Sequence, residues 1–316
     1  MDFIKKTSSR VLAGILQSFR YDRVFFLALL VTMLVAYSLQ VSSLGFYWDD
    51  WQAIFLSRLG RPIDYWNFYL SDRPFSAWIY ILSVPLLGMS PLPWQIYTLL
   101  LRFLSVLGFY WAFTGLWPQR TWQVRWMALL LAVFPGFLQQ PISVAYSQHF
   151  MTYALLTLSL AGMVWGQRQP RYFWVLTPLA LLGCLVHAFT MEYFLGLELL
   201  RPVFLWILVY RQDEKKRQTV LKVLKLWTPY LIILTSFMIW RIFIFPGLLS
   251  GPDRNSLDLL TQLAAAPFST ALGIIETAWQ NFVYLTLLVW ANAIPDSINL
   301  QSRAVLFSWV IGLGTA

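Results

Sequence analysis

The chain has 316 residues, of which 59% are hydrophobic and 18% are aromatic, while only 12% are charged. This composition excludes an ordinary soluble domain and predicts an integral membrane protein. The net charge of +9 does not indicate nucleic-acid binding, because basic residues in a membrane chain mostly report topology and here gather in short loops. The single cysteine, Cys184, excludes an internal disulfide and a thiolate metal cluster.

The apolar runs have the length of membrane-spanning helices, roughly 17 to 22 residues, and lack the alternation of outer-membrane barrel strands. The sequence therefore predicts an all-α integral membrane protein, a polytopic helical bundle of about nine spans in a single transmembrane domain over residues 1–316.

Basic residues crowd the first 23 positions, and the first predicted span follows from Val24 to about Leu44. No small-residue cleavage site follows the apolar run, so residues 1–23 are interpreted as the cytoplasmic side of an uncleaved anchor. Residues 45–92 then form one long outer loop.

The outer loop contains two candidate helices that do not cross the membrane. Trp48, Trp51, Phe55 and Leu59 recur at i, i+3, i+7 and i+11, which is typical of an amphipathic helix lying at the interface. The run from Pro74 to Met89 contains a proline and is too short to span, so we expect a juxtamembrane or re-entrant helix there.

The topology of the remaining chain follows from its basic loop, residues 211–225, which the positive-inside rule places in the cytoplasm. Counting from that loop also places residues 118–125 and 167–171 inside. A last run, from near Val305 to Ala316, is too short to span, so we interpret the C-terminus as incomplete or as a partial helix. The other predicted spans are approximately Trp94–Leu116, Trp126–Leu138, Phe150–Trp165, Phe173–Val186, Met191–Tyr210, Leu226–Phe245 and Ser269–Trp290.

This topology gathers scarce ionisable residues on the outer side. A charge at the centre of a membrane helix costs about 2.5–3.5 kcal/mol on insertion scales, so such residues usually face a cavity or a partner. Structural explanations stay open: the acidic pair fits a solvated helix N-terminus, and the arginine fits an interfacial position with its stem in the bilayer. The gathered residues are Asp49, Asp50, Asp72, Arg73, His149, His187 and Glu192.

Short motifs between residues 20 and 210 resemble those of a known family. An acidic pair, Asp49-Asp50, follows the first span, Arg73-Pro74 opens the short helix that ends at Leu87-Gly88, and Arg102 lies early in the second span. This order is similar to that of the GT-C superfamily of polyprenyl-phosphate-sugar-dependent glycosyltransferases, in particular the branch of protein O-mannosyltransferases and lipid A aminoarabinose transferases. Two positions depart from the pattern: His149 stands where an acid is usual, and the turn Thr190–Tyr193 lacks a lysine.

The resemblance implies an inverting transfer of a sugar from a polyprenyl-phosphate donor to an acceptor glycan, lipid or protein on the outer side of a membrane. The absence of glycosylation and retention signals favours a bacterial plasma membrane. It implies Asp49 as general base and Asp50 as its orienting partner or a metal ligand. The residues expected to bind substrate are Arg73 and Arg102 at the lipid phosphate, His149, His187 and Glu192 at the sugar, and Trp48 and Trp51 stacked on sugar rings.

The sequence contains no phosphate-binding loop or dinucleotide fingerprint, which argues against soluble nucleotide cofactors. A divalent metal ion is the cofactor that the outer residues could hold, with Asp50 and His149 as candidate ligands. Two other functions stay open. A lipid or sugar transporter would also concentrate charge near a cavity, although the chain lacks the expected inverted repeats. A non-catalytic subunit bound to partner subunits in a larger membrane complex needs no catalytic residue.

Overall fold

The computed structural model describes residues 22–70, 72–137, 139–210, 216–245 and 258–292. Regular structure in these ranges is helical, and no strand occurs in them. Four of their helical segments are long and apolar enough to cross a membrane, so the chain is an all-α membrane protein. These segments are Pro91–Leu116, Pro170–Thr190, Glu192–Tyr210 and Lys216–Ile244.

The described helices group into two compact units. The first comprises the helices from α2 to α11 and the helical turn Trp240–Ile244 that follows. The second comprises residues 134–137 with α12 (Asp258–Ala265), α13 (Pro267–Val283) and α14 (Val289–Asn292). The predictions for residues 1–21, for residues 211–215 of the predicted cytoplasmic loop, and for the last apolar run lie outside the described residues.

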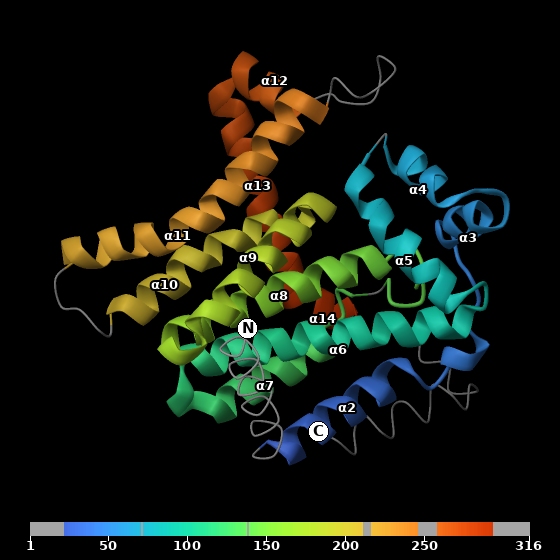
Figure 1. Cartoon of the computed structure of the whole chain (residues 1–316), viewed down its shortest axis with the longest axis horizontal. Coiled ribbons are helices and arrows are strands. Elements are labelled where there is room, and N and C mark those ends of the chain that lie inside the picture. Colours follow the sequence, from blue (N-terminus) through green and yellow to red (C-terminus); the bar gives the residue numbers. More distant parts are fainter. Residues whose placement is uncertain (1–21, 71, 138, 211–215, 246–257, 293–316) are drawn as a thin grey trace. The chain divides into compact units, whose positions relative to one another are not determined.

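The centre of the first unit is a row of three helices, α6 (Pro91–Leu116), α8 (Ser147–Arg168) and α9 (Phe173–Thr190), in which α8 packs against both others (Figure 1). A Cβ on Gly108 of α6 would lie 2.5 Å from Thr157 Oγ1 and 2.7 Å from the backbone of α8. Only glycine permits this close approach, which is how membrane helices gain packing contact without a hydrophobic driving force.

Two further layers flank this row. Helices α10 (Leu200–Tyr210) and α11 (Lys216–Ile239) extend the core formed by α6, α8 and α9. Helices α2 (Arg23–Tyr37) and α7 (Thr121–Ala132) pack against the middle of α6. Helix α7 ends before the predicted end of its span near Leu138, because Pro135 disfavours helical geometry at the preceding residue.

Three short helices cover the end of the bundle where α6 begins: α3 (Asp50–Leu59), α4 (Pro62–Tyr69) and α5 (Ala77–Leu87) (Figure 1). The last is preceded by a 3-10 turn, η2 (Pro74–Ser76), and ends at Gly88, whose φ of 66° favours glycine. It has 11 residues, which is too few to span a membrane.

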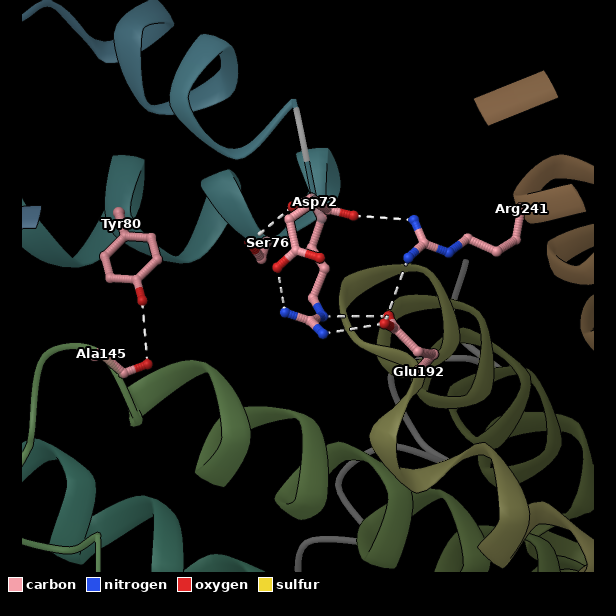
Figure 2. Close-up of polar contacts among 7 residues, drawn as sticks. Asp72, Ser76, Tyr80, Ala145, Glu192 and Arg241 are labelled. Atoms are coloured by element: carbon pink, nitrogen blue, oxygen red, sulfur yellow. Dashed lines mark hydrogen bonds and ion pairs between the residues drawn. The ribbon is translucent and has the colours of Figure 1, made fainter. Parts of the chain in front are cut away.

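The rings of Tyr65, Tyr80 and Tyr69 stack in a tyrosine column within this layer. The centroid of the Tyr80 ring lies 5.8 Å from that of Tyr65 and 5.0 Å from that of Tyr69. The column joins α4 to α5, and the Tyr80 hydroxyl donates a hydrogen bond of 3.2 Å to the Ala145 carbonyl (Figure 2). Residues 139–146, which precede α8, are therefore attached to the layer of short helices. This layer corresponds to the predicted outer loop.

Candidate functional site

The adjacent acids Asp49 and Asp50 face different surroundings, as expected for neighbours about 100° apart on a helix. Asp50 is completely buried. Its Oδ1 accepts hydrogen bonds from the backbone N–H groups of Val144 (2.9 Å) and Ala145 (2.8 Å), and its Oδ2 accepts one from Tyr47 (3.1 Å). Both oxygens are thus engaged by backbone donors, and Asp50 fastens residues 139–146 to the start of α3.

Burial raises the pKa of Asp50, although these three backbone donors oppose the rise. A divalent ion bound by Asp50 would have to compete with three N–H groups for the same oxygens. The geometry favours a positioning role for Asp50.

Asp49 is exposed at the N-cap of α3. Burial raises the pKa of Tyr146, and the negative charge of Asp49 raises it further. The same charge contributes, after burial, to the raised pKa of Tyr69. Asp49 therefore lies in electrostatic reach of the start of α8 and of the tyrosine column, while its carboxylate stays accessible.

Arg73, immediately before Pro74, forms a fork with Glu192. Its Nε lies 3.3 Å from Oε2 and its Nη2 lies 3.1 Å from Oε1 of that carboxylate. A further hydrogen bond joins Nη1 to Asp72. Burial alone would lower the pKa of Arg73, but Glu192 and Asp72 together raise it above its usual value.

A second arginine reaches the same carboxylate (Figure 2). Arg241 Nη2 lies 3.6 Å from Glu192 Oε1, and its Nη1 donates a hydrogen bond of 3.0 Å to the Asp72 carbonyl. This residue belongs to a single π-helical turn, Trp240–Ile244, that follows α11. Such turns are common at functional sites because they re-aim a side chain.

His149 lies between two tyrosines in the first turn of α8. Its ring stacks on Tyr146 with centroids 4.6 Å apart and contacts Tyr193 at 5.2 Å. The Arg73 guanidinium lies over the Tyr193 ring, 4.5 Å from its centroid. Burial, assisted by the positive charge of Arg73, lowers the pKa of His149 to about 4, and its buried Nδ1 makes no hydrogen bond among the described residues.

These contacts, together with the electrostatic effect of Asp49 on Tyr146, connect side chains from five segments of the fold in one arc. At one end is the exposed carboxylate, in the middle are the aromatic rings, and at the other end are two arginines that share a carboxylate. The arc consists of Asp49, Tyr146, His149, Tyr193, Arg73, Glu192 and Arg241.

Arg102 belongs to a different cluster. It is buried, and its Nε donates a hydrogen bond of 3.1 Å to the Ala132 carbonyl. Its guanidinium also lies 3.9 Å from the ring centroid of Tyr37, whose hydroxyl accepts a hydrogen bond from Nη2, and 3.5 Å from Gln140 Oε1. Arg102 therefore joins α2 and α7 to residues 139–146, and binding a lipid phosphate would require these bonds to break.

His187 also lies apart from the arc. Helix α9 continues through it to Thr190, so His187 faces the bundle, where its Nε2 lies 2.6 Å from Glu198 Oε1. Arg201 forms an ion pair with the same carboxylate. Ligand atoms of Cys184, His187 and Glu198 lie within 4.8 Å of one another, but Arg201 takes both carboxylate oxygens, so the trio fits a cation poorly.

Both tryptophans of the predicted stacking pair are exposed, Trp48 at 81% and Trp51 at 58%. The aromatic rings that belong to the arc are instead those of Tyr146, His149 and Tyr193. Arg241 was not singled out from the sequence, where it is an arginine near the predicted outer end of the apolar run Leu226–Phe245. Neither a protein-family model nor a curated protein matches this chain.

Proposed function

We propose that this chain is an inverting GT-C-type glycosyltransferase that moves a sugar from a polyprenyl-phosphate donor to an acceptor hydroxyl at the outer face of a membrane. The observation that carries the proposal is the arc itself. It combines an accessible carboxylate, Asp49, with two arginines, Arg73 and Arg241, across a row of aromatic rings.

The chemistry of such a transfer needs a base and an anion site. Asp49 accepts the proton of the acceptor hydroxyl, whose oxygen then attacks the anomeric carbon of the sugar from the face opposite the phosphate. The bond between that carbon and the phosphate oxygen breaks, and the lipid phosphate leaves with its electron pair. Arg73 and Arg241 neutralise the charge that develops on the leaving group.

The carboxylate of Glu192 supports this assignment because it receives donors from both arginines. A phosphate offers the same acceptor oxygens with more negative charge, so it competes for the same guanidinium donors. Tyr146 and Tyr193, with neutral His149 between them, provide an aromatic surface for the apolar face of a sugar.

The finer topology belongs to the same proposal. It comprises nine spans, a cytoplasmic N-terminus, α3 to α5 on the outer side and a bacterial plasma membrane. The short helix α5 and the gathering of the arc beside the short helices favour it.

The test is transfer of radiolabelled sugar from a polyprenyl-phosphate donor pool in membranes that contain wild type or a variant at matched expression. We expect Asp49→Asn to lower the rate about 10²–10⁴-fold, which is the usual contribution of a general base. Asp64→Asn is the matched control, because Asp64 lies in the same loop but pairs with Arg61. Full activity of Asp49→Asn, or an inactive wild type that co-purifies with a defined complex, would contradict the proposal and favour a non-catalytic subunit.

A further inference from the structure

An open groove of about 710 Å³ runs beside α3. Its walls come from the segment before α3, from α3 itself and from the residue that follows Gly88 at the end of α5. Apolar side chains dominate the lining, with two polar side chains of α3 beside them. The residues that define the groove are Phe46, Trp51, Phe55, Met89, Gln52 and Arg58.

The only charged side chain in this lining is Arg58, which is exposed. Among the described residues no carboxylate lies within ion-pairing distance of it. Its neighbour Arg61, in contrast, already pairs with Asp64 at 3.8 Å. The groove therefore combines an apolar wall with an uncompensated positive charge. A ligand that matches both features is an anion that carries an apolar chain.

The position of α3 specifies the source of that anion. Trp51 and Phe55 are 58% and 63% exposed on this helix, and Trp48 precedes them with a φ of 46°. A left-handed conformation at a bulky residue costs on the order of 1–3 kcal/mol in local strain, and here it accompanies a Trp side chain that is largely exposed. Exposed tryptophans beside an arginine are typical of a helix in the headgroup region of a bilayer.

We propose that this groove binds an anionic phospholipid of the bilayer, with an acyl chain along Phe46, Trp51 and Met89 and the headgroup phosphate on Arg58. One guanidinium, assisted by the amide of Gln52, matches a phosphodiester with a single negative charge. A phosphate monoester or diphosphate carries more charge and fits the paired arginines of the arc better. The lipid site is separate from the proposed transfer reaction, because none of its lining residues belongs to the arc.

The experiment is native mass spectrometry of the purified full chain, titrated in detergent with phosphatidylglycerol or phosphatidylcholine of identical acyl chains. We expect wild type to bind one phosphatidylglycerol about fivefold more tightly than phosphatidylcholine, as one arginine near an anionic headgroup provides. Arg58→Gln should abolish this preference, and Arg61→Gln, the matched control, should retain it. Trp51→Ala should weaken the binding of both lipids, because it removes part of the apolar wall of the groove and leaves the charge of Arg58 unchanged.

Three results would overturn the proposal. The first is an unchanged preference in Arg58→Gln. The second is an equal loss in Arg61→Gln, which would indicate general surface attraction. The third is displacement of phosphatidylglycerol by a polyprenyl monophosphate that binds more tightly and depends on Arg58, which would assign the groove to the donor lipid. Protection of the buried Cys184 thiol verifies that each variant is folded.

Discussion

Replacing Asp50 tests whether this buried carboxylate positions residues 139–146. In Asp50→Ala the backbone N–H groups of Val144 and Ala145, both buried, lose their acceptor, while Tyr47 is exposed enough for its N–H to reach water. Each unsatisfied buried donor costs about 1–3 kcal/mol, so the free energy of unfolding should fall by about 2–6 kcal/mol. Asp50→Asn keeps an acceptor for both groups and should lose about 1–2 kcal/mol.

The single cysteine supplies the assay. Cys184 is completely buried, so a thiol-reactive fluorophore labels it only when the chain opens, and heating in its presence gives an unfolding curve. We expect Asp50→Ala to lower the midpoint by on the order of 10 °C. Asp49→Ala is the matched control: its carboxylate is exposed, so its midpoint should stay near that of wild type while transfer is lost.

Two results would contradict a positioning role for Asp50: an unfolding midpoint of Asp50→Ala equal to that of wild type, or a midpoint of Asp49→Ala as low as that of Asp50→Ala. Either result would mean that the two acids do not divide the roles of positioning and chemistry.

Three further predictions concern the arc and the helix row. Arg73→Gln should cost about 1–3 kcal/mol of stability because Glu192 loses a charged partner, and the double variant with Glu192→Gln should recover part of that loss in the same thiol assay. The pKa of His149 is lowered to about 4, so the unfolded state binds its proton first as the pH falls. Wild type should therefore lose up to about 3 kcal/mol between pH 6.5 and pH 4 relative to His149→Gln in tryptophan-fluorescence melts, and parallel curves would contradict the shift. Gly108→Ala should destabilise by about 1–3 kcal/mol through a clash with α8, whereas Gly273→Ala, which meets open space, should be neutral or stabilising; equal melting temperatures would contradict the close approach.

Periodicity and length were enough to predict two of the three short helices, α3 and α5, but not α4. The apolar stripe around Trp51 and Phe55 predicted α3, and the short proline-containing run after Arg73 predicted η2 and α5. Both signals are local, because they depend on spacing within one helix. The end of α9 was harder to predict from the sequence. The helix extends past Val186 to Thr190, and His187 in this extension pairs with Glu198 on another segment.

The candidate site was predictable only in part for a related reason. Scarcity of charge marked Arg73, His149 and Glu192, and the structure brings these three together. The same scarcity also marked His187, and the family resemblance marked Arg102; both have partners in other clusters. A rare charge reveals that a partner is needed but not which one, because the partner is set by helix packing across long stretches of sequence.

The attachment of residues 139–146 has a consequence for the order of assembly during synthesis. Five side chains that hold this segment precede it in the chain, and one, Ser147 at the start of α8, follows it directly and donates a hydrogen bond of 2.7 Å to the Val144 carbonyl. Because the N-terminal part of a protein leaves the ribosome first, the nascent helices can already present these groups when the segment emerges. Its backbone then docks on a surface that is already formed. A chain truncated after α8 keeps these anchors, whereas removal of α3 takes away the acceptor for the N–H groups of Val144 and Ala145. The anchoring side chains are those of Asp50, Tyr80, Gln95, Thr98 and Arg102.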